Sequence, residues 1–200
     1  MAPTHVYLAS KSPRRRELLC QVGLADQTIA LNAADEVDET PHPGEAPPAY
    51  VRRIARNKAA AGWERVCSER LTAYPLLAAD TTVSVDGHIL GKPPTAAAAA
   101  EMLRALSGRT HQVYTAVAVA WDNHIETALS ESNVTMRALS EAEVARYVST
   151  GEPMDKAGAY AVQGRAAVFI ERIEGSYSGV MGLPLFETAN LLFGAGLVLL

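Results

Sequence analysis

The sequence predicts an α/β fold built on a mixed, partly antiparallel sheet that is flanked by helices. Strand-like and helix-like segments alternate along most of the 200 residues, a pattern that favours βαβ units with parallel strands. Two long strand-like segments, 111–121 and 124–137, are separated only by Asp122-Asn123, so they can pair only as antiparallel neighbours. No repeat or linker interrupts the pattern, and we expect a single domain over residues 1–200.

The chain is expected to open with a strand, a turn and a helix. Val6 to Ala9 form a short apolar strand, and Ser12 is placed to cap a helix. Pro13 stands at the first helical position, where its missing N–H costs nothing. Gly23 is expected to end this helix in the left-handed conformation.

A second strand, 28–31, is followed by the acidic stretch 35–39 and a proline-rich loop that runs to Pro48. The next segment, 49–65, predicts a helix by its apolar spacing. Its inward stripe consists of Val51, Ile54, Ala55 and Lys58. Lys58 therefore either extends outward along the apolar surface or reaches into a cleft.

Residues 76–83 predict a strand that is buried on both faces, although Asp80 interrupts its apolar run. The dipeptide Asp86-Gly87 is typical of a two-residue hairpin turn, which leads into the short strand 88–90. A carboxylate inside an apolar strand loses hydration and therefore needs a cation, a metal or a hydrogen-bond donor. Asp80 is thus either a structural aspartate that caps a loop or a functional group.

Two further helices carry clear end signals. Thr95 can cap an alanine-rich helix that ends at Ser107-Gly108. Ser140 and Glu143 form a capping box, and Gly151 stops that helix. The remaining expected elements are a strand near 166–173, a glycine- and serine-rich turn and a last helix that begins near Pro184.

Composition excludes several classes of protein. The net charge of −4 argues against a general nucleic-acid binder but not against a small anionic ligand. Cys20 and Cys67 stand alone without metal-ligand spacing, which favours free thiols in a reducing compartment. No signal-peptide pattern appears, and the apolar tail 191–200 is shorter than the roughly 20 residues of a membrane span. We expect a cytoplasmic protein without membrane partners.

The first helix predicts an anion site at Ser12-Pro13-Arg14-Arg15. A helix N-terminus attracts anions, and arginines in its first turn are unfavourable unless an anion binds there. Guanidinium groups also donate in pairs to phosphate oxygens. A solvated arginine run remains the alternative, and the preceding strand favours the site because ligands gather at the carboxyl ends of strands.

Other candidates are weaker by themselves. A functional Asp80 would be a metal ligand or the general base that activates a water. Lys92 lies between Gly91 and Pro93, and Glu39 lies in the acidic run. Both residue types are most often solvated in loops. The sequence lacks a Walker A loop, a GxSxG elbow and a GxGxxG motif.

A set of ordered motifs resembles the Maf family of nucleotide pyrophosphatases. The opening segment Ala9-Ser10-Lys11-Ser12-Pro13-Arg14-Arg15-Arg16-Glu17-Leu18-Leu19 matches the opening signature of the family. The resemblance continues through 37–39, 56–59, 79–81, 91–93, 106–108, 111–116, 155–160, 163–164 and 182–184. It therefore covers almost the full length of the chain.

The resemblance implies a mixed α/β fold like that of inosine triphosphatases, with two lobes around a deep cleft. It also implies house-cleaning hydrolysis of dTTP and UTP, or of modified pyrimidine nucleotides, to monophosphate and pyrophosphate. The cofactor would be a divalent metal, Mg²⁺ or Mn²⁺, and the protein a homodimer that binds no nucleic acid polymer. Another hydrolase that cuts at the γ-phosphate and a nucleotide-sensing regulator remain alternatives.

Residue by residue, the resemblance makes Asp80 the general base and, with Glu39, a metal ligand. Arg14, Thr81 and Gln163 match the positions that separate a dTTP/UTP subgroup from a 7-methyl-GTP subgroup. The implied substrate-binding residues are Ser10, Arg14, Arg15, Glu39, Lys58, Lys92 and Gln163.

Overall fold

The computed structural model describes residues 3–31, 37–122 and 124–199. Within these ranges, seven strands form one mixed sheet in the order β2-β1-β3-β5-β6-β7, and β4 pairs with β3. The strands are β1 (Val6–Leu8), β2 (Thr28–Ala30), β3 (Leu76–Val85), β4 (His88–Leu90), β5 (Thr110–Trp121), β6 (His124–Met136) and β7 (Ile170–Glu174). β1 pairs in parallel with β2 and β3, and the other pairs are antiparallel. The predicted α/β class with a mixed sheet is confirmed.

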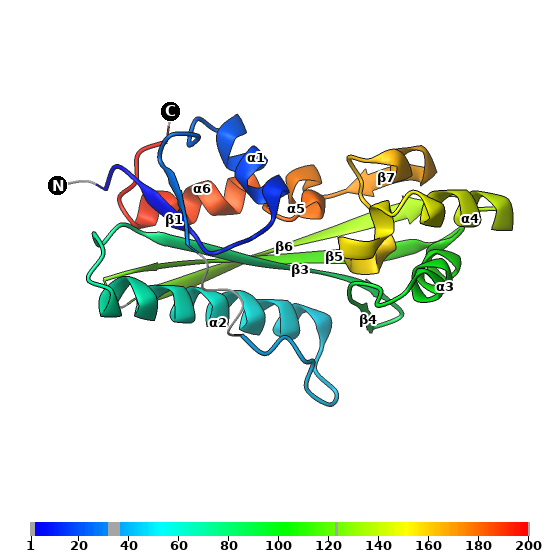
Figure 1. Ribbon diagram of the computed structural model, residues 1–200, viewed down its shortest axis with the longest axis horizontal. Helices are drawn as coiled ribbons and strands as arrows, with labels where there is room; N and C mark the ends of the chain where they lie inside the picture. Colours follow the sequence, from blue (N-terminus) through cyan, green and yellow to red (C-terminus); the bar gives the residue numbers. More distant parts are fainter. Residues whose placement is uncertain (1–2, 32–36, 123, 200) are drawn as a thin grey trace.

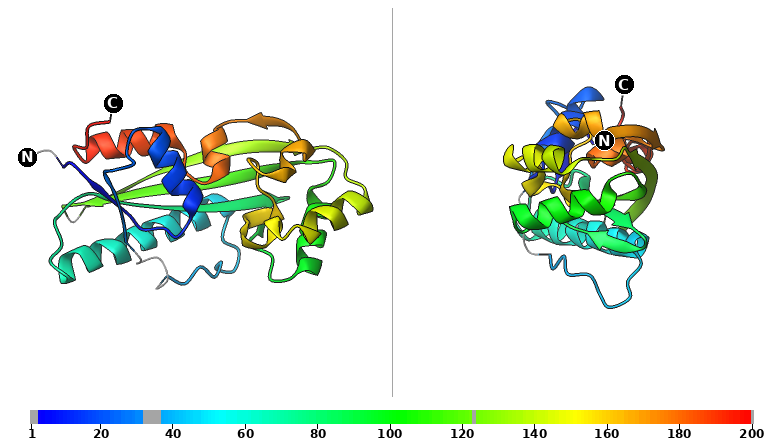
Figure 2. Two further views of the ribbon diagram at one scale, coloured as in Figure 1. Left: turned by 45° about the horizontal axis from the view of Figure 1, so that its top comes forward. Right: turned by 90° about the vertical axis from the view of Figure 1, so that its right-hand side faces the viewer.

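Helices cover both faces of this sheet. The long helix α2 lies along one face, while α1, α5 and α6 lie over the other (Figure 1). α3 and α4 pack together at one end of the elongated molecule, as Figure 2 shows from two further sides. The helices are α1 (Pro13–Gln21), α2 (Pro47–Ser68), α3 (Ala96–Leu106), α4 (Glu141–Ser149), α5 (Tyr177–Met181) and α6 (Leu185–Gly194), with 3₁₀ helices at Glu152–Asp155, Ala157–Ala159 and Arg165–Phe169.

Most predicted helix ends are confirmed. Thr95 accepts a hydrogen bond from the Ala98 N–H, and the Ser140–Glu143 capping box is complete. Gly23 follows α1 with a φ of +82°, and Asp86-Gly87 forms the predicted hairpin with positive φ at both residues. The end of α1 and the hairpin turn thus both use positive φ, a backbone conformation that most residues with side chains avoid.

The structure corrects the prediction that Ser12 caps α1 through its side chain. Ser12 occupies the N-cap position, but its side chain makes no cap hydrogen bond. Instead the Ser12 N–H donates to Ser10 Oγ over 3.1 Å. The turn before α1 is therefore stabilised by the hydroxyl of Ser10, which Arg15 also contacts.

Other predicted boundaries shift. The strand expected near 166–173 begins only at Ile170, because Arg165–Phe169 form a 3₁₀ helix that buries Ala166 and Phe169 three residues apart. The glycine- and serine-rich turn contains α5, which Ser176 caps by accepting from the Gly179 N–H. α2 begins at Pro47 rather than Ala49, since proline is tolerated in a first turn. Asp35 and Glu36 of the acidic stretch lie outside the described residues.

The sheet separates two apolar cores, and β3 contributes alternate residues to each. Leu76 and Ala78 pack in the core under α2. Leu77 and Ala79 pack in the larger core on the opposite face. Side chains alternate along a strand, so Asp80 continues the row that faces α2. Its neighbour Thr81 faces the side of α1 and α5, where it contacts Arg15.

One edge of β3 has a gap between two short strands. β1 pairs with β3 only at Leu76 and Leu77, and β4 pairs with it only from Val83 to Val85. Between them, residues 79–82 have no strand partner on this edge within the described part of the sheet. Side chains of both faces of β3, including Asp80 and Thr81, line a cleft at this gap.

Gly158 packs directly against β3 where the gap ends. Its φ is +68°, and a Cβ at this position would lie 2.8–2.9 Å from three carbon atoms of the Val83 side chain. We expect Gly158→Ala to lower the free energy of unfolding by about 3 kcal/mol, because backbone strain and overpacking add. Gly87→Ala is the matched control: φ is +78° there, but a Cβ would meet no atom within 4 Å, so about 1 kcal/mol is expected. The free energy of unfolding of both variants is measured by urea denaturation, and equal losses in the two would contradict the packing explanation.

No helix within the described ranges is both long enough and apolar enough to cross a membrane.

Candidate active site

A cleft of ≈ 670 Å³ opens at the gap in the sheet. Its walls come from the β1–α1 turn, the loop before α2, α2 itself, the middle of β3, the segment after β4, residues 155–163 and the end of α5. Every residue that the sequence suggested for a site lines it. They are Ser10, Arg14, Arg15, Glu39, Lys58, Asp80, Thr81, Lys92 and Gln163.

Lys58 is buried between two carboxylates on the α2 side of the cleft. Its Nζ lies 2.7 Å from Asp80 Oδ1 and 2.5 Å from Glu39 Oε1. Lys58 is 6% exposed and Asp80 7%, so this ion pair is largely removed from water. The inward stripe of α2 thus brings Lys58 to the one carboxylate of β3. Of the two orientations that the helical spacing left open for Lys58, the structure shows the one directed into the cleft. The three charges leave one net negative charge for a further cation.

Two residues of α2 fix the loop that carries Glu39. The Tyr50 hydroxyl donates to the Glu39 carbonyl over 2.9 Å. Arg53 donates to the Thr40 carbonyl over 3.1 Å and pairs with Glu45. Burial and the charges of Asp80 and Glu39 raise the pKa of Tyr50 to about 12, so it remains a donor. Glu39, weak as a sequence signal, is therefore held in the cleft by its backbone.

The environment of Asp80 suits a proton acceptor. Burial raises the pKa of its carboxyl, while Lys58 and Arg15 act in the opposite direction and Glu39 adds to the rise. The net shift is upward. A carboxylate with a raised pKa holds a proton more strongly than a solvated aspartate and is a better general base. The adjacent ammonium group of Lys58 favours the ionised form of this carboxyl.

Arg15 is held by three oxygen atoms of the protein. Its Nε donates to the Gly182 carbonyl over 2.8 Å, its Nη1 to Ser10 Oγ over 3.1 Å and its Nη2 to Thr81 Oγ1 over 3.4 Å. Burial lowers its pKa, yet an arginine remains charged at any ordinary pH. Its guanidinium therefore supplies a fixed positive charge beside the start of α1.

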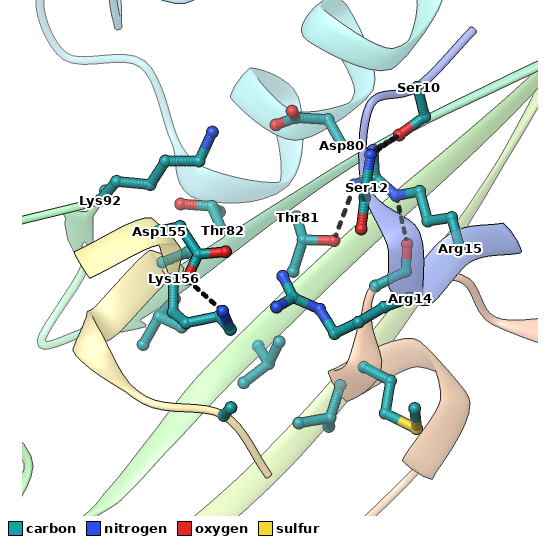
Figure 3. A pocket seen from close by; sticks show the side chains of 18 of the residues that line it. Ser10, Ser12, Arg14, Arg15, Asp80, Thr81, Thr82, Lys92, Asp155 and Lys156 are labelled. Atoms are coloured by element: carbon teal, nitrogen blue, oxygen red, sulfur yellow. Dashed lines mark hydrogen bonds and ion pairs between the residues drawn. The ribbon is translucent and has the colours of Figure 1, made fainter. Parts of the chain in front are cut away.

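Charged groups face one another across the cleft on the side of β3 opposite α2. Figure 3 shows Arg14 reaching into the cleft from α1 and Lys156 reaching toward it from the opposite wall. Lys156 forms an ion pair with Asp155. Burial alone would raise the pKa of Asp155, but this ion pair and the charge of Arg14 lower it. Lys92 extends along the other side, with Asp80 and Thr82 (Figure 3).

The wall that carries Gln163 is supported from behind. The Tyr147 hydroxyl accepts from the Ala161 N–H over 3.3 Å and donates to Glu152 over 2.9 Å. Glu152 in turn accepts from the Arg165 N–H over 3.2 Å. Residues 161–165 are thus fixed by two side chains outside the cleft. The ring of Tyr160, next to this segment, also lines the cleft.

His111 lies behind Tyr160, and its Nε2 is 2.8 Å from the tyrosine hydroxyl. Burial lowers the pKa of His111 to about 4, so its ring is neutral near pH 7. Burial also raises the pKa of Tyr160. This pair is therefore uncharged and supports the apolar part of the cleft.

The cleft residues that the sequence did not suggest include Tyr50, Thr82, Lys156 and Tyr160. Signals for two of them were present. Tyr50 begins the inward stripe of α2 eight residues before Lys58, and Thr82 follows Asp80 by two residues on the same face of the strand. Lys156 and Tyr160 belong to the motif 155–160, whose role could not be derived from the residues alone.

The residues present fit a divalent cation that a phosphate-bearing ligand helps to coordinate. Within the described ranges no group of three or more His, Cys, Asp or Glu side chains could hold a metal ion unaided. Glu39 and Asp80 offer two carboxylates with one net negative charge after pairing with Lys58. Mg²⁺ typically binds one or two carboxylates and completes its shell with phosphate oxygens and water.

Comparisons with known proteins identify the family. The model of the family described as "Maf-like protein" matches residues 5–195. A dTTP/UTP pyrophosphatase of Bordetella parapertussis is 54% identical over 98% of this chain and 94% of its own length. The dTTP/UTP pyrophosphatase of Aromatoleum aromaticum is 53% identical (96% and 95% covered), and that of Chromobacterium violaceum is 55% identical (94% and 93%).

Among solved structures, the Ham1 protein of Staphylococcus aureus aligns with 95% of this chain and 96% of its own, with 12% identity and a TM-score of 0.47. The family match spans nearly every residue of the sequence. The chain therefore belongs to the Maf family.

Proposed function

We propose that this protein is a nucleoside triphosphate pyrophosphatase that hydrolyses dTTP and UTP to the monophosphate and pyrophosphate. One observation carries the proposal: a buried carboxylate, Asp80, is held by Lys58 in a cleft whose opposite wall is the arginine-bearing start of α1. The names of relatives more than 50% identical supply the substrates. This arrangement supports the assignment of a base beside a site for phosphate groups.

The first part of the mechanism is binding. The start of α1 and the cations that line the cleft attract the triphosphate, and the fixed guanidinium of Arg15 adds charge without further reorganisation. Arg14, Lys92 and Lys156, which extend into or along the cleft, are assigned to neutralise the phosphate oxygens as charge develops on the pyrophosphate leaving group. We assign base recognition to Arg14, Thr81 and Gln163.

The second part is proton transfer. Asp80 Oδ takes the proton of a water that attacks the α-phosphorus, and Lys58 keeps the carboxylate ionised and oriented before attack. Glu39, on the other side of Lys58, completes the orientation of that ammonium group. Bound Mg²⁺ or Mn²⁺, held by Asp80 and Glu39, would supply Lewis-acid stabilisation of the phosphate charge.

A panel of nucleotides tests this proposal. Purified protein is incubated with dTTP, UTP, CTP, GTP and 7-methyl-GTP in Mg²⁺ or Mn²⁺, and the products are separated by ion exchange. We expect pyrophosphate from dTTP and UTP above the other nucleotides, and no turnover after the metal is removed with EDTA. Orthophosphate as the product would indicate cleavage at the γ-phosphate. Binding without turnover would indicate a nucleotide sensor, and preference for 7-methyl-GTP would overturn the assigned specificity.

A further inference from the structure

A buried threonine of β5 is connected to the cleft through hydroxyl groups. Thr115 is 1% exposed and lies beside Thr81 in the β3–β5 pairing. Its Oγ1 donates to the Gly179 carbonyl over 2.7 Å. The same oxygen lies 2.9 Å from Thr81 Oγ1. Thr115 itself does not line the cleft, whereas Thr81 does.

The direction of these hydrogen bonds follows from the number of protons. A threonine hydroxyl has one proton and two lone pairs. Thr115 uses its proton on the Gly179 carbonyl, so Thr81 must be the donor in the bond between the two hydroxyls. Thr81 then has no proton left for the cleft. It can only accept, and it accepts from Arg15 Nη2.

The same count of one proton and two lone pairs applies to the Ser10 hydroxyl. Its Oγ accepts from Arg15 Nη1 and from the Ser12 N–H, both over 3.1 Å. Both lone pairs are therefore occupied. Toward a ligand in the cleft, the Ser10 hydroxyl can act only as a donor, and phosphate oxygens are acceptors. Arg15 connects the acceptor Thr81 to the donor Ser10.

We infer that Thr115 is a positioning residue for the proposed reaction. Its buried hydroxyl accepts the proton of Thr81, so Thr81 can only accept from Arg15. Arg15 in turn donates to Ser10 Oγ. The Ser10 hydroxyl proton is then available to donate to the triphosphate. Arg15 thus acts largely by orienting Ser10 and the turn before α1, in addition to its charge. This inference rests on the proposed function, because the phosphate is the acceptor that the arrangement suits.

The test is a double-mutant cycle between Thr115 and Thr81. Thr115→Val keeps the branched shape and removes the hydroxyl. We expect it to lower kcat/KM for UTP about tenfold, mainly through a higher KM, because one hydrogen bond to substrate is weakened. In a Thr81→Val background, Thr115→Val should have no further effect on kcat/KM, since it acts through Thr81. Multiplicative effects of the two substitutions would overturn the inference.

Two controls separate positioning from stability. Thr115→Ser retains the hydroxyl and should stay within about twofold of the unchanged protein. Thr188→Val removes a threonine hydroxyl of α6 that is equally buried, at 2% exposed, and should leave kcat/KM unchanged. Thr115→Ala provides a second hydroxyl-free variant if Thr115→Val fails to fold. Loss of activity in Thr115→Ser as large as in Thr115→Val would also overturn the inference.

The same variants are titrated with the α,β-imido analogue of UTP by calorimetry. Failure of the unchanged protein to release pyrophosphate from UTP itself would contradict the proposed function. Normal affinity of Thr115→Val and Thr115→Ala for the analogue would contradict the inference alone.

Discussion

Replacing Asp80 with Asn is expected to lower kcat for pyrophosphate release from UTP by about 10³-fold, the usual magnitude for loss of a general base. The amide keeps the size of the side chain and can still accept a hydrogen bond from Lys58, but it cannot take a proton from water. We expect the KM for UTP to change less than kcat. The measurement is steady-state hydrolysis at pH 7 with saturating metal.

The fold of this variant should persist. Burial raises the pKa of Asp80 above its unfolded value, so any stability from this group is complete below the unfolded pKa and is lost as the pH rises through the folded pKa. Asparagine has no such loss, and Tm at pH 7 should not fall. Asp86→Asn, at the exposed hairpin end of the same strand, is the control and should turn over normally. Near-normal turnover by Asp80→Asn would remove Asp80 as the base.

Replacing Lys58 with Met should lower kcat/KM for UTP by about 10²-fold at pH 7 and shift its pH dependence. Methionine fills the buried space without a charge. Lys58 is the main opposing influence on the raised pKa of Asp80, so its loss raises that pKa further. Because the base must be ionised, the acidic limb of kcat/KM should move to higher pH, and activity should partly recover in alkaline buffer.

Arg52→Met is the matched control for this variant. Arg52 is an exposed cation of the same helix, and its loss should leave both the rate and the pH profile unchanged. An acidic limb in Lys58→Met that coincides with that of the unchanged protein would show that Lys58 does not set the ionisation of Asp80.

Regular periodicity made much of the fold predictable. The apolar stripe of α2, the hairpin turn at Asp86-Gly87 and the Ser140–Glu143 capping box each depend on neighbours within a few positions. The 3₁₀ helix at Arg165–Phe169 was predicted as strand because its apolar residues fit either structure. α5 was missed because five residues are too few to show a helical period.

The candidate site was predictable where a residue violated a local rule. Asp80 interrupts an apolar strand and Lys58 interrupts an apolar stripe, and the structure joins these two exceptions in one ion pair. Lys58 and Asp80 lie in different elements, 22 residues apart, so the sequence alone did not predict that they pair. Ser12 shows the opposite case: its cap signal was strong, but Ser10 and Arg15 take the hydrogen bonds of the turn. Such long-range contacts follow from the way that α1, β3 and α5 meet.

The most direct test of the proposed mechanism is to hydrolyse UTP in water enriched in ¹⁸O and to locate the label by mass spectrometry. Attack by water at the α-phosphorus in the Asp80 cleft predicts one ¹⁸O atom in UMP and unlabelled pyrophosphate. Label in the pyrophosphate would mean attack at the β-phosphorus. That result would contradict the mechanism.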